Sequence, residues 1–394
     1  MVPCQYSGPA SIILVHAIGY RLSAIGYWNI AVLFLLCSCT SRQGKLECRQ
    51  FEAASLAGNR LGISAWQQLA VYLPPSYQDR ARRFPVLYFL PNFNNALWRY
   101  TGGSYQGFHL REAMDRQIKR GAAREVIIVV PNALHFLGGS WYRNSPLTGH
   151  WEDYIAKDLV DYVDGHFRTI PLAAARGLAG HGMGGTGALE LALKHPDRFS
   201  CVYAMSPALF DQNGLKGTGL LSDRQMRHWQ ANLEKWQGLA EASRRKRFRD
   251  FIQSRLNDPS REVFWEGLLV SYAAAMAPDL ALPYPHIALP LPGLPPGSQA
   301  ELLRRYENGF GGWDDKLAQY LARGRSLKAI TLEYGRDDEY QWLRRGANYL
   351  SGLMRARGLP IVLAVHAGGH DSTLGPRLET ALLPAMSNAL RDEP

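Results

Sequence analysis

The chain of 394 residues is poor in cysteine, with five in all, and three of these precede residue 40. Cys48 and Cys201 remain for the rest of the molecule, which are too few for a disulfide scaffold. Cys201 lies in the apolar run FSCVYAM, where we expect a buried small hydrophobe. A hydrophobic core therefore has to hold the fold, and a content of 46% hydrophobic residues is enough for a large one.

The chain also lacks a long uninterrupted apolar run. Residues 10–38 are apolar overall, but polar and charged residues interrupt them, so no stretch of about 18 residues is suited to span a membrane. The shorter run NIAVLFLL at 29–36 is typical of an export signal. It is followed by LCSC, which resembles the lipobox of bacterial lipoproteins, with Cys39 as the lipidated residue. We expect residues 1–39 to direct export, giving a periplasmic or cell-envelope lipoprotein attached to the membrane through its N-terminus, or a secreted protein.

No motif for nucleic-acid or metal binding accompanies the net charge of +10. The densest basic cluster, RRKRFRD at 244–250, is bracketed by acidic and apolar residues, which favours a solvated helix face over a nucleic-acid partner. The histidines outside the glycine-rich motifs lack the paired spacing of metal ligands, so we expect no metal and no cofactor. These histidines are His109, His135, His150 and His166.

Apolar strand-like runs alternate with helix-like segments along the chain, which predicts an α/β fold with a mostly parallel sheet covered on both faces. The pattern lapses at about 208–325, where charged helix-prone sequence and a proline-rich stretch predict a helical cap inserted into one domain at 66–394. Residues 40–65 are expected to be a tether or a first edge strand. The predicted strands are 69–77, 84–92, 125–132, 199–207, 327–335 and 360–367, and the predicted helices are 111–121, 153–165, 188–195 and 342–357.

The segment GLAGHGMGGTG at 177–187 joins a short apolar lead to an alanine-rich helical run. Its layout matches the GxSxG nucleophile elbow, in which glycines allow a strained turn and a serine stands at the apex. Gly182 occupies the apex here. The chain therefore has the strand–turn–helix sequence that presents a catalytic serine in this motif, but a glycine stands at the serine position.

Two later loops supply the other members of a catalytic triad. GRDDEY at 335–340 offers three acids after the strand that follows the cap, and HAGGHDS at 366–372 offers His370 after the last strand. His366 is the poorer candidate because it still lies in the apolar alternation of the strand. A carboxylate that orients an imidazole toward the elbow is what general-base chemistry needs.

These motifs together resemble the esterase family of α/β-hydrolases that includes S-formylglutathione hydrolases, feruloyl esterases, enterochelin esterases and mycolyltransferases. The resemblance covers about residues 66–390, through FPVLYFLPNFN, SWYRNSPLTGHWEDYIAKDLVDYVDGHFRTI, RGLAGHGMGGTGALELALKHPDRFSCVYAMSP, GRDDEY and AGGHDS. It implies a small-molecule ester or acyl ligand and four roles: Asp338 as the acid, His370 as the base, and the backbone N–H groups of Phe93 and Met183 as oxyanion donors.

The chain departs from the family pattern on the catalytic apparatus itself. Gly182 replaces the nucleophilic serine, and Pro91 and Asn92 replace the His and Gly of the oxyanion loop. The main hypothesis is a ligand- or partner-binding pseudoenzyme, since loss of a triad serine leaves only residual rate enhancement. On this interpretation Gly182→Ser is expected to create esterase activity, more so with Pro91→His and Asn92→Gly.

Two alternatives stay open. In one, a water in the space of the missing serine side chain is activated by His370 and Asp338. In the other, the protein is an active esterase and Gly182 is an engineered or erroneous replacement of serine. A nucleophile from elsewhere, such as Ser140 or Ser145, is disfavoured because neither lies on an elbow.

Overall fold

The computed structural model describes residues 43–290 and 294–391. Gln43–Pro394 form one compact unit. The predicted export segment, with Cys39, lies outside the described residues. Within the described ranges, no helix has the length and the apolar character that a membrane crossing requires.

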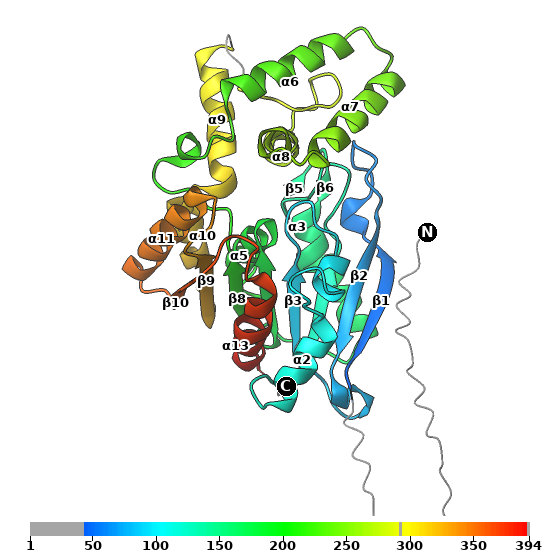
Figure 1. The fold of residues 1–394 in the computed structure, drawn as a ribbon, viewed down its shortest axis with the longest axis vertical. Coiled ribbons are helices and arrows are strands. Elements are labelled where there is room, and N and C mark those ends of the chain that lie inside the picture. The colour runs from blue at the N-terminus through cyan, green and yellow to red at the C-terminus, as the bar shows by residue number, and fades with distance from the viewer. Residues whose placement is uncertain (1–42, 291–293, 392–394) are drawn as a thin grey trace, which may run out of the picture. The chain divides into compact units, whose positions relative to one another are not determined.

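Within the described residues, eight strands form one sheet in the order β1-β2-β4-β3-β7-β8-β9-β10 (Figure 1). The first two strands pair antiparallel with their neighbours, and all pairings from β4 to β10 are parallel. This arrangement confirms the predicted fold class. The strands are β1 (Lys45–Glu52), β2 (Trp66–Leu73), β3 (Val86–Leu90), β4 (Ile127–Pro131), β7 (Arg176–His181), β8 (Cys201–Met205), β9 (Ala329–Gly335) and β10 (Ile361–His366), and a separate pair comprises β5 (Asn144–Ser145) and β6 (Gly149–His150).

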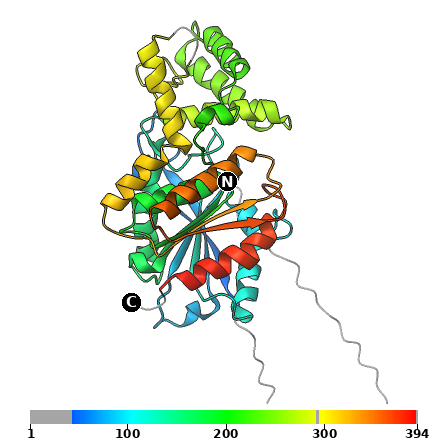
Figure 2. The same ribbon diagram turned by 90° about the vertical axis from the view of Figure 1, so that its left-hand side faces the viewer.

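Helices cover both faces of the sheet, which Figure 2 shows nearly edge-on. The central strands are buried on both sides, and their side chains alternate between two hydrophobic clusters. In β3, Tyr88 belongs to the cluster under α4, α5 and α11, whereas Leu87 and Phe89 belong to the cluster under α2 and α13. The near-continuous apolar runs of the sequence are therefore strands with two covered faces.

The helices in the body of the fold are α1 (Trp98–Thr101), α2 (Leu110–Lys119), α3 (Trp151–Asp153), the π-helical segment η3 (Tyr154–Leu159), α4 (Val160–His166), α5 (Met183–Lys194), α11 (Gln341–Ala356), α12 (Leu374–Arg377), the π-helical segment η6 (Leu378–Leu382) and α13 (Leu383–Ala389). The four helices predicted in the body of the fold are present as α2, η3 with α4, α5 and α11, whereas α1, α3, α12, η6 and α13 were not predicted. Short 3-10 turns are η1 (Ala54–Leu56), η2 (Pro75–Gln78), η4 (Ala173–Ala175) and η5 (Gly214–Gly217).

Between β8 and β9, the residues that the structure describes form helices and no strand of the main sheet. These helices are α6 (Asp223–Trp236), α7 (Glu241–Leu256), α8 (Arg261–Met276), α9 (Pro296–Phe310) and α10 (Trp313–Ala322). Trp229 is fully buried against Trp236, Phe248 and Phe251, with ring centroids 5.6–5.9 Å apart. The insertion thus has an aromatic core of its own.

The polar segment before β2 is an edge strand rather than a tether. β1 pairs with β2 along its whole length, from Lys45 opposite Leu73 to Glu52 opposite Trp66. Most side chains of β1 are exposed, as is common for an edge strand. The domain expected at 66–394 therefore begins some twenty residues earlier.

The basic cluster at 244–250 lies on α7. Lys246 pairs with Asp250 on the helix surface, and Phe248 alone of this cluster is buried, in the aromatic core of the cap. This agrees with a solvated helix face.

Candidate active site

The turn from β7 to α5 has the backbone of a nucleophile elbow. Gly182 has φ 55° and ψ −115°, a conformation that side-chain-bearing residues rarely adopt. The flanking glycines let the helix approach the sheet: a Cβ on Gly180 would meet the backbone of Gly184, and a Cβ on Gly184 would meet the carbonyl of Leu90. The glycine spacing in the sequence therefore reflects close packing around a strained apex.

The structure brings Asp338 and His370 together. The Asp338 carboxylate Oδ2 lies 3.0 Å from His370 Nδ1, although the two residues come from loops after different strands. The Asp338 side chain is fully buried, and the His370 side chain is 10% exposed. The backbone N–H of Tyr340 donates to the other carboxylate oxygen at 2.9 Å. The bond at Nδ1 leaves Nε2 as the imidazole nitrogen that is free to act in the cavity.

Each side chain of the Asp338–His370 pair favours the charged form of the other. Burial lowers the pKa of His370, but the hydrogen bond and charge of Asp338, with the charges of Asp371 and Glu339, outweigh it and raise that pKa above its ordinary value. Burial likewise raises the pKa of Asp338, but the hydrogen bond and charge of His370 lead the effects that hold it below its usual range. An ionised carboxylate thus faces a basic imidazole.

The other acids of GRDDEY shape the histidine loop instead of contacting the imidazole. Asp337 accepts a hydrogen bond from the backbone N–H of Gly368 at 3.2 Å, and Glu339 accepts one from the backbone N–H of His370 at 3.1 Å. His366, the poorer candidate, ends β10 with its Nε2 3.6 Å from Glu333. Of the three acids, Asp338 is therefore the one placed to orient the base.

The two backbone N–H groups predicted as oxyanion donors are occupied by the protein itself. The backbone N–H groups of Phe93 and Met183 both donate to Asn92 Oδ1, at 2.7 Å and 2.8 Å. Only the oxygen end of an amide can accept two such bonds, which fixes its orientation. The loop is held by two tyrosines, since Asn92 N–H donates to Tyr100 Oη at 3.0 Å and Tyr142 Oη donates to the carbonyl of Pro91 at 2.9 Å. Asn92 thus fills the place where a substrate oxygen binds in an oxyanion hole.

The same amide occupies the space in which a serine side chain at position 182 would lie. A Cβ on Gly182 would overlap the Asn92 side chain, with Nδ2 only 2.7 Å away and the oxygen closer still. One expectation from the sequence needs correction: the space is not left for a catalytic water, because a side chain takes it. Gly182→Ser would require the Asn92 side chain to move out of this space, so we expect the single variant to stay inactive while Asn92 remains there.

His181, the residue before the elbow, is fully buried beside the histidine loop. Its Nε2 lies 3.3 Å from the His370 carbonyl and 3.5 Å from Asp371 Oδ1, and its Nδ1 lies 3.4 Å from Tyr100 Oη. Burial, with the charge of His370, lowers the pKa of His181 to about 4. His181 is therefore neutral near pH 7.

One group of side chains in the described residues has donor atoms suited to a metal ion. The candidate ligand atoms of His181, His370 and Asp371 lie within 4.8 Å of one another. Nitrogen and carboxylate donors of this kind bind zinc in proteins. Sequence spacing did not indicate the group, because the fold brings residue 181 next to 370 and 371. The absence of a metal stays a prediction.

Ser206 is a site residue that the sequence reasoning missed. It follows β8 with φ 41°, lines the cavity above Gly182, and contributes a hydrogen bond that lowers the pKa of Asp338. The available signal was a Ser-Pro pair directly after a buried strand. The rejected candidates Ser140 and Ser145 are buried and lie outside this cavity; the Ser145 hydroxyl donates to the Ala274 carbonyl at 2.9 Å.

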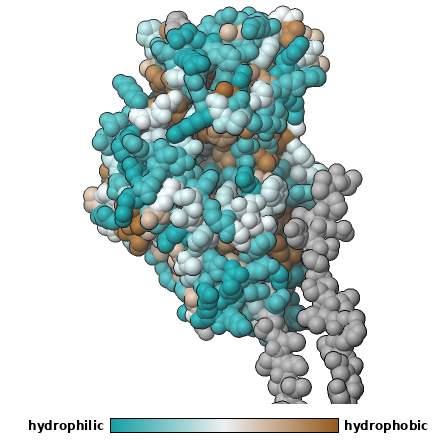
Figure 3. Space-filling model, viewed as in Figure 1, coloured by the Kyte–Doolittle hydropathy of each residue, from teal (hydrophilic) through white to brown (hydrophobic). Residues whose placement is uncertain are grey.

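A cavity of about 250 Å³ lies above the elbow, between the body and the cap. Figure 3 shows hydrophobic surface in the hollow between the cap helices and the body below them. The cap contributes α8 and α9, and the body contributes the oxyanion loop, the elbow and the start of α11. The apolar lining of the cavity is mainly aromatic and comprises Phe93, Trp141, Met183, Phe264, Trp265, Leu268, Phe310, Tyr340, Trp342 and Leu343.

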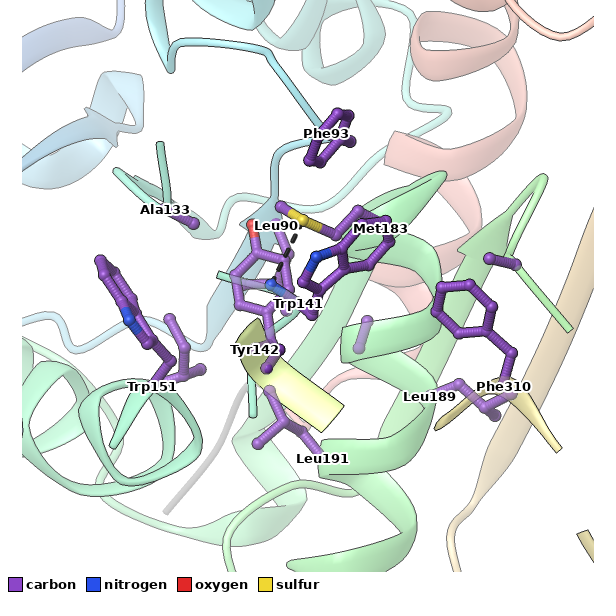
Figure 4. Close-up of a cluster of buried hydrophobic side chains, with 14 of the residues drawn as sticks. Leu90, Phe93, Ala133, Trp141, Tyr142, Trp151, Met183, Leu189, Leu191 and Phe310 are labelled. Carbon is purple, nitrogen blue, oxygen red and sulfur yellow. Dashed lines mark hydrogen bonds between the residues drawn. The ribbon is translucent and has the colours of Figure 1, made fainter. Parts of the chain in front are cut away.

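The floor of this cavity is formed by closely packed side chains. Trp141 stacks on Phe93 with ring centroids 5.1 Å apart and lies 5.3 Å from Phe310, so it joins body and cap (Figure 4). Its backbone N–H contacts Met183 Sδ at 3.4 Å, the dashed line in Figure 4. Behind α5, the buried Glu190 carboxylate binds Lys316 of α10 at 2.7 Å. The elbow helix and the cap are thus fixed to each other.

Comparisons with known proteins agree with this fold. A family model described as "Putative esterase" matches residues 65–258. A ferulic acid esterase structure is 21% identical with a TM-score of 0.52, over 88% of this chain and 98% of its own. S-formylglutathione hydrolases from Agrobacterium tumefaciens and Staphylococcus aureus are 16% and 15% identical, with TM-scores of 0.50 and 0.51. They cover 89% and 88% of this chain and 98% and 99% of their own. These structures share the fold.

Proposed function

Because this chain belongs to the esterase family of α/β-hydrolases, we propose that it binds a small ester or acyl ligand in the cavity above Gly182 without forming an acyl-enzyme. One observation carries the proposal: Asn92 Oδ1 accepts both oxyanion N–H bonds and fills the space of a serine side chain. The cavity above Gly182 therefore presents neither a nucleophile at position 182 nor an open oxyanion site. What remains is a lined cavity beside an oriented imidazole.

The fit of Asn92 around Gly182 also bears on whether glycine is an error. A serine at this position would overlap an amide that makes two good hydrogen bonds. The surroundings are thus adapted to glycine, which supports the pseudoenzyme over an active esterase with a misrecorded residue.

Labelling with a fluorophosphonate tests the loss of the nucleophile. We expect no labelled residue in the full chain, whereas an active member of the family run in parallel is labelled. Intrinsic fluorescence then reports binding, because Trp141, Trp265 and Trp342 line the cavity. Short acyl esters are expected to shift the emission and to be recovered unhydrolysed. Labelling at any residue, or burst-phase release of product, would contradict the proposal.

Hydrolysis by an activated water is the second candidate. The observation that favours it is the Asp338–His370 bond of 3.0 Å, whose imidazole lines the same cavity. The water would have to bind in the open cavity, since Asn92 fills the serine position. Slow hydrolysis of p-nitrophenyl acetate that is abolished in His370→Gln, but retained in His366→Gln, would support this candidate. Equal rates in both variants would exclude it.

We also propose that the protein is exported and lipidated at Cys39. The support is the apolar run at 29–36 followed by LCSC. Labelling bacterial cells with radioactive palmitate should tag the full chain and spare Cys39→Ala, with Cys37→Ala as the matched control. Labelling that persists without Cys39 would contradict this assignment.

A further inference from the structure

The cavity above the elbow contains one arginine whose role the proposed function leaves open. Arg99 belongs to α1 and lines the cavity, and its guanidinium lies 5.6 Å from the Tyr105 ring. In the described part of the chain, its side chain has no hydrogen-bond acceptor and no acidic partner, and its Nε is buried. A buried guanidinium N–H without a partner is costly, and such groups usually meet a protein acceptor, a water or a ligand.

Other partly buried cations near the site have acidic partners. Arg143 binds Glu190, Arg377 donates to Glu333 through Nε and Nη2, and Lys316 shares Glu190. Arg99 differs from these three cations in having no acidic partner among the described residues. It is also the only lysine or arginine in the lining of the cavity among the described residues.

We propose that the cavity takes a small monocarboxylate with an apolar, preferably aromatic, body, and that Arg99 binds the carboxylate. This deepens the proposed function and rests on it. A guanidinium presents parallel N–H donors that match a carboxylate in two bonds. The indole and phenyl groups of the lining then cover the apolar body of the ligand.

The position of Asn92 is the reason that the polar end of the ligand turns to Arg99. In an esterase with an open oxyanion site, backbone N–H groups hold the carbonyl or carboxyl oxygen of the ligand. Here both N–H groups already donate to Asn92 Oδ1. Among the lysines and arginines of the described residues, Arg99 alone offers an unoccupied donor in the lining.

The charges around the cavity favour one negative charge on the ligand over two. Arg99 is a single cation, and the lining also contains Asp371, whose side chain is 56% exposed and lies 3.5 Å from His181 Nε2. A phosphate dianion would meet one guanidinium and the repulsion of this carboxylate. A volume of about 250 Å³ also limits the ligand to a small molecule.

The test compares 3-phenylpropanoate with 3-phenylpropanamide, which have the same body and differ in charge. Isothermal titration calorimetry on the full chain should give at least tenfold tighter binding for the acid. Arg99→Gln should weaken the acid by tenfold or more and leave the amide unchanged, and Arg99→Lys should restore part of the preference. Arg261→Gln is the matched control, because Arg261 stacks on Tyr340 at 4.7 Å but does not line the cavity.

The outcomes separate this inference from the proposed function. If acid and amide bind the unmodified chain equally, the carboxylate assignment is wrong while the cavity still binds a ligand. If Arg99→Gln folds normally by circular dichroism and keeps the preference for the acid, Arg99 is not the anchor. If neither probe binds, the ligand class is wrong, and the fluorophosphonate and ester-binding experiments still decide the proposed function independently.

Discussion

The two halves of the candidate site differ in how closely they match the geometry of a catalytic triad. On one side, Asp338 and His370 keep the buried hydrogen bond of an acid and a base. On the other, Gly182 lacks a nucleophile and Asn92 fills both its space and the oxyanion site. The difference lies in burial: the Asp338–His370 pair is part of the interior, whereas Asn92 lies at the edge of the cavity. The buried pair is costly to break, whereas a side chain at the edge of a cavity is easily exchanged.

The largest expected effect is on ester hydrolysis and comes from substitutions at Gly182 and Asn92. Gly182→Ser alone should stay inactive and lose about 1–3 kcal/mol of stability, because its Cβ overlaps Asn92. The double variant, Gly182→Ser with Asn92→Gly, should hydrolyse p-nitrophenyl acetate on the order of 10²- to 10³-fold faster than Gly182→Ser alone, since nucleophile and oxyanion donors are restored together. Adding Pro91→His should raise the rate further. The comparison fails if the single variant matches the double one, or if His370→Gln added to the double variant leaves its rate unchanged.

The second test measures how much stability each half supplies. Asp338→Asn removes a charge from a buried pair and should cost about 3–5 kcal/mol in the free energy of unfolding. Asn92→Ala should cost only about 1 kcal/mol, because the freed N–H groups face the cavity and bind water. Urea unfolding of both variants against the unmodified chain gives the two numbers. Equal losses would show that both halves are equally part of the fold.

The third test uses pH. The raised pKa of His370 stabilises the fold fully below its unfolded value of about 6.5, and this contribution is lost as pH rises through the folded pKa. The lowered pKa of Asp338 acts above its unfolded value of about 3.9 and is lost as pH falls. The advantage of the unmodified chain over His370→Gln should therefore be greatest between about pH 4 and 6.5 and should shrink toward pH 9. An advantage that grows above pH 7 would contradict the raised pKa.

The smallest expected effect concerns Ser206. Its hydroxyl is one of several groups that stabilise the Asp338 carboxylate, so Ser206→Ala should cost about 0.5–1.5 kcal/mol. The substitution should also raise the pKa of Asp338 slightly, which NMR titration of its carboxyl carbon can follow. Ser254→Ala, in a cap helix away from the site, serves as the control. A loss as large as that of Asp338→Asn would mean that Ser206 holds the loop itself.

The elements predicted from the sequence largely match the structure, because their signals are local. β3 and β4 were visible as apolar runs, and the turn at Gly182 was visible as glycine spacing. The edge strand β1 was harder to identify, because its side chains are mostly exposed and only its pairing with β2 defines it. The choice of Asp338 from three adjacent acids rested on a family resemblance, and the geometry now supplies its physical reason, the bond to His370.

The sequence by itself determined the fold class, the chain order of the candidate site residues and the glycine at the apex of the turn, since each depends on residue type and short-range pattern. Only the tertiary structure decided which side chain occupies the space beside Gly182. Asn92 and Met183 are 91 residues apart, and parallel strands β3 and β7 place the loops after them side by side. A hydrogen bond between such loops depends on where strands end in space, which no local pattern encodes.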